Sequence, residues 1–210
     1  GVTTEVRSLP GMQKEAVVRG RAPEAGVWRI VCDEGPYLNG TDLAPFPLAF
    51  FTAGLQFCLM ERLQGVAAAR GLALDGLALA LDNYYTMKGS FIKGDAVGGA
   101  RPAEVRLQLE SAAPAREVAE AVRAALASCP GQAVMAQALA NVFSLHVNGK
   151  RVAVEGVPAS ARGDDADPEA TTFRTFQAAP RADDLDDIVV KTREAEHVHG
   201  VEGGVASSLK

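Results

Sequence analysis

The chain has 210 residues, 48% of them hydrophobic, and a formal net charge of −5. A chain of this length and composition can bury one sizeable core. Its acidic and basic residues are interspersed, so it offers no basic stripe for a nucleic-acid backbone, and no uninterrupted apolar run reaches the roughly 18 residues of a membrane span. We therefore expect neither nucleic acid nor a membrane as a partner. The N-terminus lacks the pattern of a secretory signal, so we expect a cytoplasmic protein.

The first 44 residues are predicted to form strands followed by a loop. The segments 3–9, 15–21 and 27–33 are short, partly alternating and rich in β-branched residues, and turns containing proline and glycine separate them. Residues 34–44 contain many turn-forming residues and are expected to be a loop.

A mixture of helices and antiparallel strands is predicted to follow. The first helix runs from Pro47 to Arg70, because proline suits the first turn and Gly71 is a natural C-terminal cap. The later elements are strands at 77–93 and 104–110 joined by a Gly/Pro-rich turn, a helix at 115–128, a helix opened by Pro130 over 131–141, and a hairpin at 143–154 with Asn148-Gly149 at its tip.

The C-terminal part of the chain changes in composition after Pro158. It is polar and acidic at first and Gly/Ser-rich at its end, with two short segments, 172–177 and 187–192, that are predicted strands. We therefore expect a domain over residues 1–158 and an extension over residues 159–210. The extension is expected to lie on the core or on a partner subunit, with frayed ends.

Three cysteines, Cys32, Cys58 and Cys129, are far apart and never form a Cys-x-x-Cys pair. This distribution argues against a zinc knuckle and a disulfide-stapled scaffold. Cys32, at the end of a predicted strand, is interpreted as a packing residue. Cys129 precedes Pro130 and would occupy a helix N-cap, where a thiolate is stabilised and its pKa lowered, or else be a buried cysteine before a turn.

Cys58 lies in the middle of the first predicted helix. Taken alone, it is a core residue, since cysteine is often buried. Helical spacing places it on one face with Phe51, Gly54 and Leu55. Gly54 leaves room one turn below the thiol, which would admit another backbone or a small ligand.

A family resemblance changes the interpretation of both cysteines. The segment PLAFFTAGLQFC, residues 47–58, resembles the signature Asn-Pro-Glu-Gln-Leu-Phe-Ala-Ala-Gly-Tyr-Ala-Ala-Cys of the OsmC/Ohr family, named for osmotically inducible protein C and organic hydroperoxide resistance protein. Cys129-Pro130 falls where the family has its second cysteine. The order of predicted elements over about residues 14 to 154 also resembles the family. The residues of the segment that coincide in register are Pro47, Phe51, Ala53, Gly54 and Cys58.

The resemblance implies an α+β fold, an antiparallel sheet wrapped around a long central helix, in an intertwined homodimer. It implies a thiol-dependent peroxidase, in which Cys58 attacks an organic hydroperoxide, becomes a sulfenic acid and forms a disulfide with Cys129. A dithiol, such as protein-bound lipoyl, would reduce that disulfide, and no cofactor is implied. The apolar Phe51 and Leu55, with Gly54, would line the pocket for an apolar substrate.

One position departs from the family signature. The family has a glutamate after the proline, which holds an arginine over the reactive thiolate, and this chain has Leu48 there. Arg19 or Arg21 of the second predicted strand could supply the cation, and Glu61 could act as the acidic partner or lie on a solvated helix face. Without an arginine held nearby, burial should raise the pKa of Cys58.

Two alternative functions follow from that departure. The chain could be a divergent OsmC-like protein whose thiols serve another redox reaction, or a non-enzymatic dimeric protein that binds a small molecule.

A metal site is not expected, because His197 and His199 lack a third ligand and the aspartates at 183, 184, 186 and 187 lack the spacing of a calcium loop.

Overall fold

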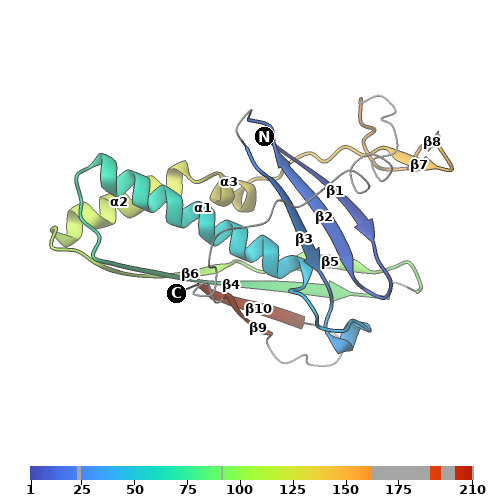
Figure 1. The fold of residues 1–210 in the computed structure, drawn as a ribbon, viewed down its shortest axis with the longest axis horizontal. Coiled ribbons are helices and arrows are strands. Elements are labelled where there is room, and N and C mark those ends of the chain that lie inside the picture. Colours follow the sequence, from blue (N-terminus) through green and yellow to red (C-terminus); the bar gives the residue numbers. More distant parts are fainter. Residues whose placement is uncertain (23–24, 91, 162–189, 195–201, 210) are drawn as a thin grey trace. The chain divides into compact units, whose positions relative to one another are not determined.

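The computed structural model describes residues 1–22, 25–90, 92–161, 190–194 and 202–209. The chain divides into two compact units, and each is described by itself (Figure 1). Unit 1 comprises residues 1–44 and 137–181, and unit 2 comprises residues 45–136 and 182–210.

Unit 1 contains an antiparallel sheet with β2 (Lys14–Gly20) between β1 (Val2–Ser8) and β3 (Val27–Cys32). These strands confirm the prediction for the N-terminal segments. A separate hairpin pairs β7 (Leu145–Val147) with β8 (Lys150–Val152). Its tip is Asn148-Gly149, as predicted, and both residues have positive φ, as a tight two-residue hairpin turn requires.

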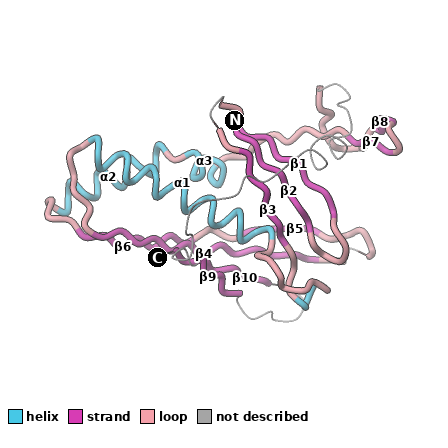
Figure 2. Tube along the Cα trace, viewed as in Figure 1, coloured by secondary structure: helices cyan, strands magenta, loops and turns pink. Residues whose placement is uncertain are grey.

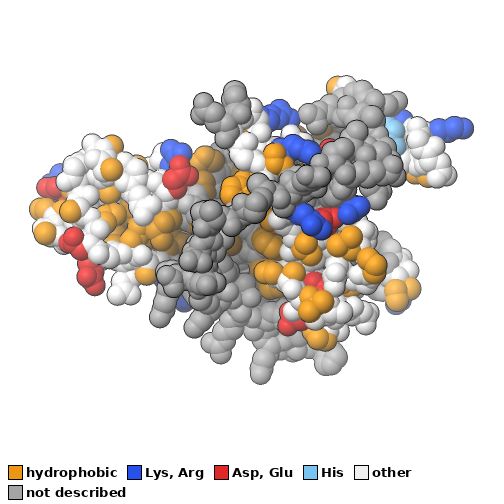
Figure 3. Space-filling view, in the orientation of Figure 1, with side chains coloured by type: hydrophobic (Ala, Val, Ile, Leu, Met, Phe, Trp, Pro, Cys, Tyr) orange, Lys and Arg blue, Asp and Glu red, His pale blue; other side chains and the backbone are white. Residues whose placement is uncertain are grey.

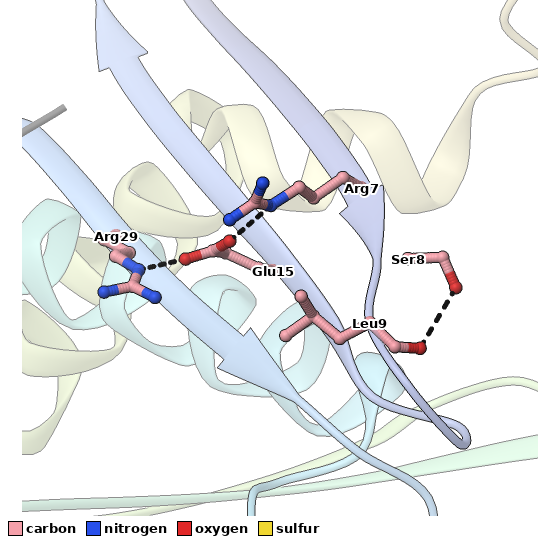
Figure 4. A network of polar contacts seen from close by, with 5 residues as sticks. All are labelled: Arg7, Ser8, Leu9, Glu15 and Arg29. Atoms are coloured by element: carbon pink, nitrogen blue, oxygen red, sulfur yellow. Dashed lines mark hydrogen bonds and ion pairs between the residues drawn. The ribbon is translucent and has the colours of Figure 1, made fainter. Parts of the chain in front are cut away.

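A buried carboxylate lies at the centre of the unit 1 sheet. Figure 4 shows Arg7 of β1 and Arg29 of β3 converging on Glu15 of β2. Arg7 Nε donates a hydrogen bond to one carboxylate oxygen at 2.7 Å, and Arg29 Nε donates to the other. Burial acts to raise the pKa of Glu15, but the two guanidinium groups outweigh it and hold that pKa below its ordinary value. Glu15 therefore stays charged although only 2% of it is exposed.

The loop after β3 is organised by Asp33. Its carboxylate accepts hydrogen bonds from the Thr41 hydroxyl at 2.6 Å and from the backbone N–H groups of Glu34, Thr41 and Leu43 at 2.8 to 3.3 Å. The Thr41 hydroxyl first and then these N–H groups favour the charged form and lower the pKa of Asp33 to about 2. Gly40 is required in this loop, because a Cβ there would lie 1.7 Å from the Glu34 carbonyl oxygen. The loop also contains a short 3₁₀ helix, η1 (Pro36–Leu38).

Unit 2 is built on a sheet whose central strand is β4 (Gly76–Lys88). On one edge β4 pairs with β6 (Glu104–Glu110) and β5 (Val97–Ala100), and on the other with β10 (Glu202–Leu209), which pairs in turn with β9 (Val190–Glu194). All these pairs are antiparallel. Together with the helices they confirm the predicted α+β class.

The helices of unit 2 lie on one side of this sheet (Figure 2). They are α1 (Pro47–Ala69), α2 (Ala115–Ser128) and α3 (Pro130–Ala136). The face of β4 that carries Leu79 and Leu81 is buried, and so are Leu59 and Leu63 of α1. A buried hydrogen bond of 2.9 Å from Asn83 Nδ2 of β4 to Thr52 Oγ1 of α1 fixes the register of helix against strand. None of the helices within the described ranges is long and apolar enough to cross a membrane.

The bounds of α1, α2 and β6 agree with the sequence predictions. Helix α1 ends just before Gly71, whose φ of 66° is the left-handed conformation of a C-terminal cap. Helix α3, predicted over 131–141, ends at Ala136. Residues beyond it, such as Leu139, are exposed, so no buried face supports a longer helix.

Two strands were not expected from the sequence. Strand β5 lies within the segment predicted as a Gly/Pro-rich turn, because the chain reverses earlier, at Gly89 and Gly94, which both have positive φ. Strand β10 lies in the Gly/Ser-rich C-terminus predicted to fray, where pairing with β4 supplies its hydrogen bonds. Of the strands predicted in the extension, 187–192 overlaps β9, and 172–177 lies outside the described residues.

Candidate dithiol site

Unit 2 brings together the two cysteines that the sequence singled out. Cys58 lies in the middle of α1, and Cys129 lies at the junction of α2 and α3. The Cys129 thiol donates to the Cys58 sulfur, with 3.4 Å between the sulfur atoms, although 71 positions separate the residues in sequence. Both thiols are free. The arrangement is a dithiol whose two sulfurs can reach each other within one chain.

The backbone at Cys129 explains how its sulfur is directed at α1. Cys129 has an extended conformation, with φ −83° and ψ 116°, between two helices. Pro130 disfavours the α conformation in the residue before it, so α2 must end there. The Cys129 carbonyl then accepts the Ala133 N–H at 3.1 Å, which starts α3.

The two thiols differ in exposure. Cys129 is only 2% exposed, and it belongs to a buried apolar cluster with Leu59 and Leu79. Cys58 is partly exposed and packs against the edge of that cluster. A reagent from solution therefore reaches Cys58 more readily than Cys129.

Gly131 lies beside the thiol of Cys58, and the sequence analysis did not predict this contact. A Cβ at Gly131 would lie 3.4 Å from Cys58 Cβ, 3.5 Å from Cys58 Sγ and 3.3 Å from Leu55 Cδ2. The absence of a side chain lets the first turn of α3 approach α1 closely. The Gly131 N–H donates a hydrogen bond to the Cys58 sulfur. A glycine directly after Cys-Pro was the available sequence signal for this contact.

The surroundings raise the pKa of Cys58 above its ordinary value. Burial is the largest cause, because it disfavours the thiolate. The Gly131 N–H acts in the opposite direction, while repulsion between two neighbouring thiolates and the carboxylate charge of Glu61 raise the pKa of Cys58 further. This direction agrees with the expectation from the apolar sequence around Cys58. Glu61 itself is exposed on a solvated face of α1, and its Oε1 lies 3.7 Å from Nη2 of Arg62.

The predicted pocket residues have different surroundings. Leu55 is buried and lies against Gly131, beside the dithiol. Phe51 is 40% exposed, and a Cβ added at Gly54 would meet no atom within 4 Å. The space that the sequence predicted at Gly54 is therefore present on α1, and its use for a substrate stays a prediction.

The two candidate activating arginines belong to unit 1. Arg19 forms an ion pair with Glu5 across β1 and β2, and Arg21 Nε lies 3.4 Å from the Thr3 hydroxyl oxygen. Leu48, at the position of the family glutamate, lies in the first turn of α1 and is 41% exposed. The role of either arginine toward Cys58 stays a prediction.

Within the described ranges of the chain, no group of three or more His, Cys, Asp or Glu side chains could hold a metal ion. His197 and His199, and the aspartates at positions 183, 184, 186 and 187, lie outside the described residues.

Comparison with known proteins finds likeness in solved structures. No family model matches the chain, and no curated protein matches it. An OsmC-like hydroperoxide resistance protein from Jannaschia sp. CCS1 is 22% identical, with a TM-score of 0.48 over 72% of this chain and 96% of that one. An OsmC-like protein from Mycoplasma pneumoniae is 15% identical, with a TM-score of 0.45 over 64% of this chain and 85% of that one. The organic hydroperoxide resistance protein OsmC from Legionella pneumophila is 16% identical, with a TM-score of 0.44 over 64% of this chain and 89% of that one.

The family that the sequence signature resembles is thus also found among the structural neighbours.

Proposed function

We propose that this chain is a dithiol peroxidase that reduces an organic hydroperoxide through Cys58 and Cys129. The observation that carries the proposal is the separation of 3.4 Å between the two sulfurs, with one thiol accessible and the other buried. Two cysteines so placed can form a disulfide with a small displacement, which is the step that completes a two-cysteine reduction.

The first step takes place at Cys58, since its sulfur is the more accessible. Its thiolate attacks the terminal oxygen of the hydroperoxide, and the O–O bond breaks. The organic alkoxide leaves and takes up a proton to become an alcohol. Cys58 is oxidised to a sulfenic acid, and the peroxide is reduced by two electrons.

The second step takes place between the two cysteines. The Cys129 thiolate attacks the sulfur of the Cys58 sulfenic acid, a disulfide forms, and hydroxide leaves and is protonated to water. The burial of Cys129 suits this role, because it has to meet only Cys58. An external dithiol then returns both cysteines to thiols and becomes a disulfide itself.

The test is a stoichiometric oxidation of the reduced protein by an organic hydroperoxide. We expect one Cys58–Cys129 disulfide per chain by peptide mapping and one alcohol per disulfide. Cys129→Ser should stop at a Cys58 sulfenic acid, which dimedone traps, while Cys32→Ser should behave as the unmodified chain. If both thiols stay reduced under conditions that oxidise a control peroxidase, the proposed function is wrong.

The partly exposed Cys58 beside a buried Cys129 also suits a second candidate function, the exchange of thiol and disulfide with an apolar partner molecule. That reaction also needs the Cys58 thiolate, so the raised pKa of Cys58 slows both reactions and does not choose between them. Rapid formation of the Cys58–Cys129 disulfide by an oxidised dithiol, without turnover of hydroperoxide, would select this candidate.

A homodimer is part of the proposed function. Several large apolar side chains of α1 are exposed in the single chain, among them Phe51 and Phe57, at 40% and 53%. A helix with apolar residues around most of its circumference is usually covered on all sides. A second copy of the chain is the partner that we propose for this surface.

A further inference from the structure

Unit 2 contains a cavity next to the dithiol that the proposed reaction does not use. Its volume is about 130 Å³. Its walls come from α1, α2, β4 and β6, and every side chain that lines it is apolar. It lies among side chains that pack around Cys129, since Leu59 and Leu79 line the cavity and also belong to the buried cluster of that cysteine.

The cavity has a more exposed side between α2 and β6. Val105 of β6 and Leu126 of α2, which both line it, are 39% and 37% exposed, whereas Leu59, Leu79 and Ala125 are buried. Figure 3 shows hydrophobic side chains reaching the surface over the helical part of unit 2. A small molecule would therefore enter between α2 and β6, with the buried leucines at the inner end.

The chemistry of the walls selects the class of ligand. A lining made of apolar side chains gives a water molecule few hydrogen-bond partners, so water should bind weakly in the cavity. An apolar cavity of about 150 Å³ in another protein takes up benzene or xenon. We propose that this cavity is a binding site for one compact apolar molecule of about the size of benzene, held beside Cys129 within a single chain.

Such a ligand should also protect Cys129. Cys129 is 2% exposed and shares a buried cluster with Leu59 and Leu79, which line the cavity, so we expect a movement that exposes its sulfur to open the cavity as well. A ligand that binds only the closed form shifts the equilibrium away from opening by the factor 1 + [L]/Kd. At a benzene concentration ten times its Kd, alkylation of Cys129 should slow about tenfold.

The test uses the full chain with Cys58→Ser, so that no redox step takes part. Alkylation of each remaining cysteine by iodoacetamide is followed by peptide mapping, with and without benzene. We expect Cys129 to be protected and Cys32, which lies in unit 1, to react at an unchanged rate. The absence of any protection of Cys129 by benzene would overturn the proposal.

A filled cavity provides the second arm. Ala125→Leu on the same background places a larger side chain into the cavity and should abolish the protection by benzene. Ala127→Leu makes the same change at an exposed position of α2 and should keep it. If Ala125→Leu does not fold, Ala125→Val adds a smaller side chain and should weaken the protection of Cys129. Equal protection of Cys129 in the filled variant and in Ala127→Leu would contradict the proposal.

This proposal is independent of the proposed function. The chain could lack peroxidase activity and still bind benzene, because the assay contains no hydroperoxide. Conversely, if the chain reduces hydroperoxide but benzene does not protect Cys129, only the proposed cavity site is refuted.

Discussion

The sulfur of Cys58 lies 3.4 Å from the sulfur of Cys129, and the thiol of Cys129 is the donor in that contact. The two residues come from the middle of α1 and from the end of α2, so the pair depends on the packing of α1 against the α2–α3 junction. Closing this contact into a covalent bond would link α1 directly to the α2–α3 junction.

Oxidation to the disulfide should therefore stabilise the protein. The crosslink would span 71 positions. A loop of that length removes about 4 kcal/mol of chain entropy from the unfolded state, so Tm should rise by roughly 10 °C. Thermal unfolding followed by circular dichroism, with and without a reductant, measures the difference. Cys58→Ser should unfold at the same temperature under both conditions, and equal Tm values for both forms of the unmodified chain would contradict the prediction.

The carboxylate of Glu61 should influence the titration of Cys58. Because the pKa of Cys58 is raised, its thiolate fraction at pH 7 is small. Its alkylation rate should therefore keep rising with pH beyond the pH at which the alkylation rate of glutathione becomes constant. Glu61→Gln removes one of the charges that raise the pKa, so the rate profile should move to lower pH.

The pH dependence of Cys58 alkylation by iodoacetamide, resolved by peptide mapping, measures this shift. The matched control is Glu104→Gln, which removes an exposed carboxylate from β6 instead of from α1. The difference should shrink in 1 M salt, because Glu61 is exposed and its charge is screened. A profile that moves to higher pH in Glu61→Gln would contradict the assigned cause.

Gly131 should control the approach of the two sulfurs. In Gly131→Ala the new Cβ would lie 3.3 Å from Leu55 Cδ2, so Leu55 or the first turn of α3 must shift by a few tenths of an ångström, and the added methyl would contact Cys58 Cβ and Sγ at 3.4 and 3.5 Å. We expect slower formation of the Cys58–Cys129 disulfide, measured with an oxidised dithiol under pseudo-first-order conditions.

The control for Gly131 is Gly65→Ala in α1. A Cβ at Gly65 would meet no atom within 4 Å, so this variant should form the disulfide at the unmodified rate and gain up to about 1 kcal/mol from helix propensity. Slowing of equal size in both variants would show that added bulk at the thiol is not the cause.

The charge of Asp33 should make the stability of unit 1 depend on acid pH. The folded pKa of about 2 is below the unfolded value of about 3.9, so the stabilisation is complete above pH 4 and is lost as the pH falls toward 2. Asp33→Asn should be less stable at neutral pH and should lose less additional stability over that range. Urea unfolding at several pH values measures both effects, with Asp75→Asn at an exposed position as the control. A parallel pH dependence in Asp33→Asn and the unmodified chain would refute the role of Asp33.

The sequence predicted local elements well where a local signal exists. Pro47 and Gly71 mark the ends of α1, and Pro130 separates α2 from α3, because proline and glycine act through their own backbone conformation. The choice of Cys58 and Cys129 came from a family resemblance, since no local rule brings together residues 71 positions apart.

The features missed by sequence reasoning depend on contacts between distant elements. The role of Gly131 exists only because α3 touches α1, and the cavity exists only because side chains of β6 and α2 fail to fill the space over Leu59. Strand β10 has a poor strand sequence and is held by β4. Tertiary pairing outweighs local propensity in such cases.

The exposed apolar side of α1 leads to the last prediction, that the chain is a homodimer whose contact includes Phe57. One chain has a mass of 21.9 kDa. The mass of the unmodified protein obtained from sedimentation should be twice that value. Phe57→Glu places a charge in an apolar contact, where desolvation is costly, and should sediment as the single chain. Val97→Glu is the matched control, since Val97 of β5 is also exposed, at 66%, and should leave the dimer intact. Sedimentation velocity of the three proteins decides the question: a dimer that persists in Phe57→Glu would exclude this side of α1 as the contact, and a monomeric unmodified protein would exclude the homodimer itself.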